Sequence, residues 1–293
     1  MWLKKDLSTL RRIRTSLAFR LLGQDGIAAL VQSDGPSLRA VRARVAAEID
    51  KRLGSTVAYG PFRGLKLAPA KGWNSLDRAG LLLAIYEREL LEHLAAACSV
   101  PRPFVNVGAA DGYYVVGALW AGWCDRAVAF ETSPDRRALI AETAALNGVS
   151  DRLTILGQAG DDMVDAASQS LEGGGGAVWL IDVEGAEFSL LNDFVLGKLR
   201  DATLVVEVHR WADPSGEARE RLWTRARAFD RVAFGTGARD PFCFEELADC
   251  SDDERWLVCS ERRRMPGLWW QLTGPAAPHH RPIDGVGVDA LTR

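Results

Sequence analysis

Three acidic residues within six positions mark one segment as the strongest candidate for chemistry. The segment IDVEGAE (181–187) follows an apolar run, precedes a helical pattern, and carries Asp182, Glu184 and Glu187. Carboxylates this close repel one another, and burying them costs free energy unless cations or hydrogen-bond donors compensate. The start of a surface helix accounts for Glu187, but not for Asp182 directly after such an apolar run. We therefore expect Asp182 and Glu184 to act in a functional site.

A glutamate and a histidine follow the next apolar run along the chain. In the segment VEVH (206–209), Glu207 and His209 are two positions apart, so their side chains share one face at the end of a strand. His209 could act as a general base near neutral pH, and a structural role is an equal alternative. Asp182, Glu207 and His209 could also bind a divalent cation such as Mg²⁺ or Mn²⁺, which is the less favoured interpretation.

Two glycines four positions apart predict a tight turn between a strand and a helix. They are Gly108 and Gly112 in the segment FVNVGAADG (104–112), and a missing side chain lets a ligand approach the backbone. The dinucleotide pattern GxGxxG would need glycines at positions 110 and 113, which are alanine and tyrosine here. The space for a pyrophosphate is therefore reduced, and a nucleoside without phosphates fits better.

An acidic residue lies at the end of the following strand pattern. Glu131 comes 23 residues after Gly108 and is placed to accept hydrogen bonds from both hydroxyls of a ribose. Alternatively, it is only a neighbour of the helix start in the segment ETSP (131–134). Together with the glycine turn, the ribose role is favoured.

These residues are expected to be positioned by alternating strands and helices. Strand patterns occupy 104–107, 127–131, 153–156, 177–183 and 202–208. Helical patterns occupy 113–121, 134–147, 161–171 and 186–196. This alternation predicts an α/β fold with a doubly wound, mainly parallel sheet, in which ligands bind beyond the carboxyl ends of the strands. Two further strands, expected at 231–234 and 256–260, could pair as an antiparallel edge.

The chain before this array is predicted to be helical. An amphipathic pattern covers 3–21, a second helix runs from Ser37 to a stop at Gly54 with Leu38 on its inward face, and a long helix covers 77–98. A turn at 59–62 should lead into a short strand at 64–67. We expect a helical extension (1–58), a catalytic domain (59–273) and a flexible tail (274–293).

Composition sets limits on the class of protein. The 293 residues are 47% apolar and 26% charged, which excludes a disordered chain, and we expect neither a membrane-spanning stretch nor a signal sequence. Five cysteines without a CxxC pair fit a reducing cytoplasm. The net charge is −3, but residues 1–52 hold eleven basic and five acidic residues. This basic arm could contact a second subunit, as in a homodimer, or a membrane surface, whereas the acidic remainder argues against nucleic acid as the substrate.

Four segments together resemble the FkbM-type methyltransferases, a branch of the class I S-adenosylmethionine-dependent enzymes. They are FVNVGAADG, FETSP (130–134), IDVEGAE and VEVH, and the resemblance covers about residues 59–262. It implies a seven-stranded sheet with a reversed last strand and S-adenosylmethionine as the cofactor. The residues that would contact the cofactor are Asn106, Gly108, Ala109, Asp111, Gly112, Glu131, Gln158, Ala159 and Asp182. The family often has aspartate at the position of Asn106 and asparagine at the position of Ala110.

The favoured function is O-methylation of a hydroxyl group on a sugar, glycolipid or natural product. Asp182 or His209 would take the hydroxyl proton, with Glu184 beside them. Trp211, Trp269 and Trp270 could stack on a sugar ring, although packing is the commoner role of tryptophan. Two alternatives stay open: a non-catalytic nucleoside-binding adaptor on the same fold, and a nicotinamide-dependent oxidoreductase, which the absent GxGxxG disfavours.

Overall fold

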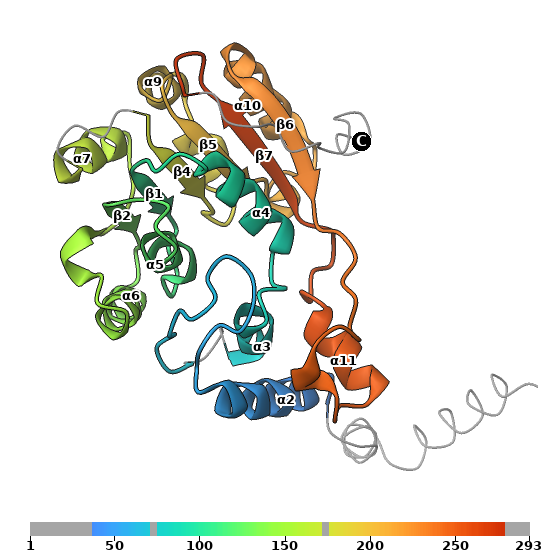
Figure 1. Ribbon diagram of the computed structural model, residues 1–293. Helices are drawn as coiled ribbons and strands as arrows, with labels where there is room; N and C mark the ends of the chain where they lie inside the picture. Colours follow the sequence, from blue (N-terminus) through green and yellow to red (C-terminus); the bar gives the residue numbers. More distant parts are fainter. Residues whose placement is uncertain (1–36, 71–74, 172–175, 279–293) are drawn as a thin grey trace, which may run out of the picture.

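A single seven-stranded sheet organises the computed structural model, which describes residues 37–70, 75–171 and 176–278 (Figure 1). The spatial order is β3-β2-β1-β4-β5-β7-β6. The first five strands of this order, from β3 to β5, pair in parallel with one another. β7 runs antiparallel to both of its neighbours, β5 and β6. The strands are β1 (Phe104–Val107), β2 (Ala127–Phe130), β3 (Leu153–Leu156), β4 (Val178–Ile181), β5 (Thr203–Glu207), β6 (Asp230–Gly235) and β7 (Leu268–Thr273).

This sheet confirms the predicted fold class. The chain forms β1, β2 and β3 outward in one direction and then returns to the other side of β1 with β4, so the strand order reverses between β1 and β4. In a doubly wound sheet, such a reversal point leaves a crevice beyond the carboxyl ends of the strands. A seven-stranded sheet with one reversed strand is also what the resemblance to class I methyltransferases implied.

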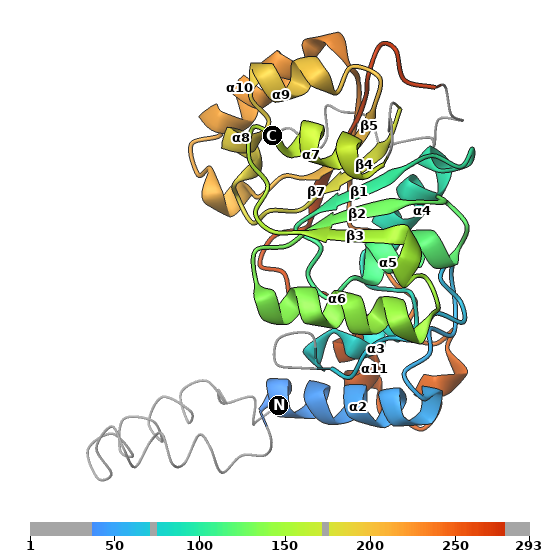
Figure 2. The same cartoon turned by 90° about the vertical axis from the view of Figure 1, so that its left-hand side faces the viewer.

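Helices cover both faces of the sheet, as Figure 2 shows most clearly. One apolar core lies between the sheet and α4, α5 and α6, and it extends to α2, α3 and α11; the other lies under α7, α9 and α10. The strands of the middle of the sheet are apolar on both faces because both are covered. The helices are α2 (Leu38–Leu53), α3 (Arg78–Leu82), α4 (Arg88–Ala97), α5 (Tyr113–Trp120), α6 (Pro134–Leu146), α7 (Met163–Ser170), α8 (Glu187–Leu190), α9 (Asp193–Lys198), α10 (Glu217–Arg225) and α11 (Asp252–Cys259).

Local helix signals were predicted well at two helices. α2 begins after Ser37, whose hydroxyl accepts a hydrogen bond from the backbone of Ala40, and ends at Gly54 in the left-handed conformation. α6 is capped by Ser133 and has proline at its first position. The prediction that Leu38 faces inward was wrong. Leu38 is 72% exposed, because it lies in the first turn of α2, beyond the part of the helix that packs on the core.

The predicted helix over 77–98 is interrupted, which is a correction with functional weight. α3 ends at Leu82 and α4 starts at Arg88, and between them Ala84 and Glu87 have positive φ angles of 53° and 49°. Such angles are unfavourable for residues other than glycine and occur where tertiary contacts impose them. The break turns Tyr86 and Glu87 toward the carboxyl ends of the strands. The helix predicted over 186–196 is likewise split into α8 and α9, because Asn192 caps α9.

The strand predicted at 256–260 was wrong, since these residues belong to α11 and the turn after it. Ser251 and Glu254 form a capping box at the start of this helix. The antiparallel partner of β6 is instead β7, which contains Trp269 and Trp270. The short strand expected at 64–67 is reduced to one bridge between Thr56 and Lys66.

Parts of the predicted organisation lie outside the described residues. The helix expected over 3–21 and the tail after residue 278 belong to these parts, and the proposed domain boundaries stay predictions. Within the described part, no helix has the length and apolar character that crossing a bilayer requires. All five cysteines are unpaired.

Candidate active site

A cavity of about 600 Å³ opens at the carboxyl ends of β1, β2 and β4, where the strand order reverses. Eight of the nine residues expected around the cofactor line it: Asn106, Gly108, Ala109, Asp111, Glu131, Gln158, Ala159 and Asp182. Gly112 is the exception. It precedes α5 with φ 88°, and a Cβ atom there would lie 3.2 Å from the Cα atom of Ile140, so this glycine allows α5 to pack closely on α6.

The glycine turn is required by packing between strand ends. Gly108 has φ 83°, and a Cβ atom at this position would lie 1.7 Å from the backbone carbonyl oxygen of Asp182. The backbone N–H groups of Gly108 and Ala109 both donate to the carbonyl oxygen of Phe130. The turn therefore fixes the ends of β1, β2 and β4 against one another. On the sequence alone, Gly108 is explained by the room it gives a ligand. Gly108 also lines the cavity, but the contact with Asp182 already requires a glycine there.

Glu131 connects the second strand end to the glycine turn. It is 4% exposed; its Oε2 accepts from the backbone N–H of Ala110 at 2.9 Å, and its Oε1 accepts from that of Ser133 at 2.8 Å. Each carboxylate oxygen can accept more than one hydrogen bond, so both retain capacity toward the cavity. Both readings of this residue are thus compatible with its geometry: it supports the helix start and also faces the cavity.

Asn106 brings an unpaired acceptor to the same cavity. The side chain is 1% exposed, its Nδ2 lies 3.5 Å from the carbonyl oxygen of Leu180, and its buried Oδ1 has no hydrogen-bond partner in the described part of the chain. Buried acceptors in folded proteins are nearly always paired. A hydrogen-bond donor on a bound molecule would satisfy this oxygen.

A second cavity of about 470 Å³ adjoins the first. Both are lined by Asp77, Tyr86, Asp182 and Glu184. Beyond this junction, the second cavity is lined by residues from the end of β5 and from the segment before β7, including Glu207, His209, Trp211 and Arg263. The predicted catalytic residues Asp182 and Glu184 therefore lie where the two cavities meet, and His209 lines the second cavity.

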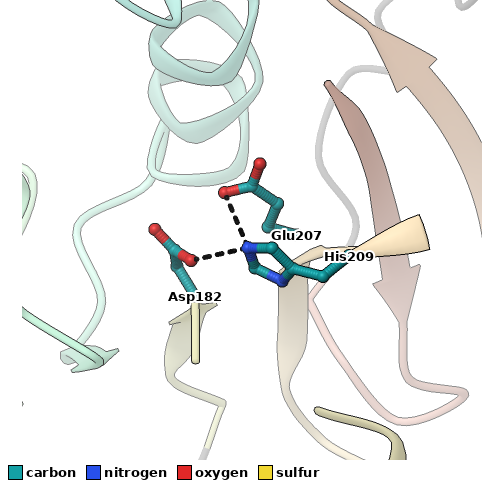
Figure 3. Close-up of side chains that lie close together, drawn as sticks. All are labelled: Asp182, Glu207 and His209. Carbon is teal, nitrogen blue, oxygen red and sulfur yellow. Dashed lines mark ion pairs between the residues drawn. The ribbon is translucent and has the colours of Figure 1, made fainter. Parts of the chain in front are cut away.

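Two strand ends bring Asp182, Glu207 and His209 together, as Figure 3 shows. His209 Nε2 lies 3.5 Å from Asp182 Oδ1 and 3.7 Å from Glu207 Oε2. The exposed carboxylate of Glu184 lies 3.6 Å from the same nitrogen. The other ring nitrogen, Nδ1, lies 3.2 Å from Oε1 of the fully buried Glu187. Burial lowers the pKa of His209, but the hydrogen bond to Glu187 and the surrounding carboxylates outweigh it and raise the pKa.

Arg263 is a cation at this junction that the sequence did not predict. Its guanidinium forms ion pairs with Glu87, Glu207 and Glu261. Burial and the charge of Glu207 raise the pKa of Glu87 to about 8, although Arg263 opposes this shift. Loss of hydration, and next the charge of Glu207, raise the pKa of Asp182 well above its usual range. Arg263 is thus one positive charge shared by three glutamates, and the acidic groups at this junction outnumber it.

Glu87 and Arg263 are the functional candidates that sequence reasoning missed. Glu87 lies inside a continuous helical pattern and Arg263 in a run of three arginines, and both patterns are typical of solvated surfaces. The acids of IDVEGAE indicated only that cations or hydrogen-bond donors should lie nearby, and the ion pairs of Arg263 are with other residues. Neither Glu87 nor Arg263 could be identified from that segment.

Comparisons with known proteins yield only distant structural similarity. Neither a protein-family model nor a curated protein matches this sequence. Cofactor-bound Rv0187 from MTB is 15% identical, with a TM-score of 0.42 over 85% of this chain and 96% of that one. The O-methyltransferase TomG from Streptomyces achromogenes, in complex with SAM, is 14% identical, with a TM-score of 0.43 over 88% and 98%. TrmK from M. capricolum, in complex with S-adenosyl-homocysteine, is 8% identical, with a TM-score of 0.38 over 64% and 71%. The fold assignment therefore rests on the strand order itself.

Proposed function

We propose that this protein is an S-adenosylmethionine-dependent methyltransferase that methylates a hydroxyl group. The observation that carries the proposal is the junction of two cavities at Asp182 and Glu184. A methyl transfer needs donor and acceptor on opposite sides of one point, in line with the bond that breaks. The first cavity would hold the donor and the second the acceptor.

The charge of the first cavity favours a cationic donor over a dinucleotide. Among the described residues, its lining includes seven acidic side chains but only one cationic side chain, Arg136. A pyrophosphate would be repelled here, whereas a sulfonium and an ammonium group would be attracted. The Oδ1 atom of Asn106 could accept a hydrogen bond from that ammonium group. This argues against the nicotinamide-dependent alternative, as the two missing glycines of GxGxxG did.

Glu131 would hold the ribose of the donor, and Gln158 and Ala159 would lie near its adenine. All three line the first cavity. Glu131 is kept in place by the backbone N–H groups of Ala110 and Ser133, so it needs no rearrangement to accept the ribose hydroxyls.

The reaction would be an in-line displacement at the methyl carbon. The acceptor oxygen forms the new O–C bond, the C–S bond breaks, and its electron pair stays on sulfur, which becomes a neutral thioether. The hydroxyl proton passes to a base at the junction, for which Asp182 and His209 are the best-placed groups. Because its pKa is raised, the ionised form of Asp182 is a stronger proton acceptor than an ordinary carboxylate.

The acceptor would be a sugar, glycolipid or natural product. Trp211 is 59% exposed at the second cavity, and its ring centroid lies 5.8 Å from that of His209. It offers an aromatic face on which a sugar ring could stack. Trp269 and Trp270 are 1% exposed and form part of the core, so they are not available for stacking.

The test begins with the donor. Calorimetric titration with S-adenosylhomocysteine should show binding, and titration with NAD should not. Extracts incubated with the protein and S-adenosylmethionine should then contain a product heavier by one methylene group. Asp182→Asn and His209→Ala should both slow the transfer. Binding without any methylated product would favour the adaptor alternative, and near wild-type rates in both variants would reject the assignment of the base.

A further inference from the structure

The side chains of Asp182, Glu207 and His209 converge on one point from two neighbouring strand ends (Figure 3). Asp182 directly follows β4, Glu207 ends β5, and His209 lies two residues further along. Each offers one ligand atom, and these atoms lie within 4.8 Å of one another. Two ligands of one ion, each about 2.1 Å from it, are separated by roughly 3.0 to 4.2 Å. The separations of 3.5 and 3.7 Å from His209 Nε2 fall in this range.

The surroundings of His209 fix which nitrogen faces this point. Nδ1 lies 3.2 Å from Glu187 Oε1, and the same oxygen accepts from the backbone N–H of His209 at 2.8 Å. Glu187 Oε2 accepts from the backbone of Gly185 at 2.9 Å, so the carboxylate is held rigidly. A donor at Nδ1 leaves Nε2 of the neutral ring as a lone pair facing carboxylates. A buried carboxylate behind the distal nitrogen is the usual support of a metal-binding histidine.

One oxygen at this point has no partner. Asp182 Oδ1 is buried and makes no hydrogen bond among the described residues. The guanidinium of Arg263, which lines the same cavity, is already shared by Glu87, Glu207 and Glu261. A neutral histidine would therefore leave lone pairs facing one another, which is unfavourable without a positive charge between them.

We propose that Asp182, Glu207 and His209 hold a divalent cation at the floor of the second cavity. Two carboxylates suit Mg²⁺ and Mn²⁺, and the imidazole favours Mn²⁺ of the two. All three residues line the second cavity, where a bound cation would make an acceptor hydroxyl more acidic. Asp182 and His209 are then ligands, and Glu184, 78% exposed and 3.6 Å from Nε2, is the nearest carboxylate that can take the released proton. This role rests on the proposed methyl transfer, whereas the cation site does not.

The site can be tested without any turnover by titrating the full-length protein with Mn²⁺ alone. The electron paramagnetic resonance signal of the free ion measures how much Mn²⁺ stays unbound. Asp182→Asn, Glu207→Gln and His209→Gln should each weaken Mn²⁺ binding tenfold or more. Glu220→Gln, an exposed acid on α10, is the matched control and should leave binding unchanged. Circular dichroism and thermal unfolding of each variant show whether it is folded.

Weak Mn²⁺ binding that is equal in the wild type and in folded Asp182→Asn would overturn the proposal. So would a nuclear magnetic resonance spectrum showing that His209 stays an imidazolium in the presence of Mn²⁺, since the ring itself would then supply the positive charge. The two proposals fail separately. Mn²⁺ binding without S-adenosylhomocysteine binding removes the methyltransferase and keeps the site, whereas methyl transfer that persists in EDTA removes the role of the cation in the reaction and keeps the methyltransferase.

Discussion

A Cβ atom on Gly108 would lie only 1.7 Å from the backbone carbonyl oxygen of Asp182, so the two residues can be neighbours only because residue 108 is a glycine. Gly108 therefore sets the distance between the glycine turn and the acidic segment IDVEGAE. Because φ at this position is also positive, any side chain is disfavoured twice, by contact and by backbone conformation.

Gly108→Ala is expected to destabilise the protein by more than about 2 kcal/mol. The strand ends must separate to accommodate the methyl group, and donor binding should be lost with them. Urea unfolding measures the effect. Gly197→Ala in α9 is the control, because a Cβ atom there meets nothing within 4 Å and alanine favours the helix. Equal stability of both variants would contradict the geometry at Gly108.

Glu131→Ala should lower the affinity for S-adenosylhomocysteine by a factor of about ten or more, which is roughly 1.4 kcal/mol. The same carboxylate supports the backbone of Ala110 and Ser133, so folding stability must be measured in parallel. Glu131→Gln keeps one acceptor oxygen and should lie between the wild type and the alanine variant. Calorimetric titration showing unchanged affinity in Glu131→Ala would exclude the ribose role.

Removing Arg263 should unfold the junction of the two cavities. Arg263→Met leaves the buried Glu87 and Glu207 without their cation, and such a loss costs about 3–5 kcal/mol. Its neighbour Arg264 is exposed on the rim of the same cavity, so Arg264→Met should change the stability by less than about 0.5 kcal/mol. Chemical denaturation of the two variants measures the difference in stability. Similar midpoints would show that Arg263 does not compensate the buried charges of Glu87 and Glu207.

The strands and the site residues attached to them were predictable because their signals are local. Mainly apolar runs mark β1 to β5. Asp182 and Glu131 each directly follow such a run, and His209 lies two residues after the end of β5. Sheet topology then brings strand ends to one edge, so a linear sequence was sufficient to place these side chains together. The capping box of α11 was an equally local signal, and it should have outweighed the apolar letters at 256–260.

Glu87 and Arg263 could not be predicted, because their roles depend on a contact across 176 residues. The helical period runs without interruption through 77–98, and nothing in it marks the break before α4. The positive φ of Glu87 is maintained by what its carboxylate contacts, including Arg263 and the hydroxyl of Tyr114. Tertiary interactions of this kind override local propensity.

His93 should make the protein less stable in mild acid. Its ring is 6% exposed, stacks on Phe234 with 3.6 Å between centroids, and its Nδ1 lies 2.9 Å from Gln271 Oε1. Burial lowers the pKa of His93 below 6.5, although the hydrogen bond to Gln271 opposes this. The folded state therefore binds this proton less readily than the unfolded state. The stability it contributes is complete above pH 6.5 and is lost as the pH falls through the folded pKa.

His93→Gln should accordingly flatten the fall in unfolding free energy between pH 7.5 and pH 5.5, by at most about 1.4 kcal/mol per pH unit, the limit for one proton. Phe234→Leu is the control: it removes the stacking partner and lowers stability at every pH, but it keeps the titrating ring and hence the slope. Denaturant unfolding at pH 7.5, 6.5 and 5.5 gives the comparison. A slope in His93→Gln equal to that of the wild type would mean that other groups, such as the carboxylates around Arg263, dominate the acid response.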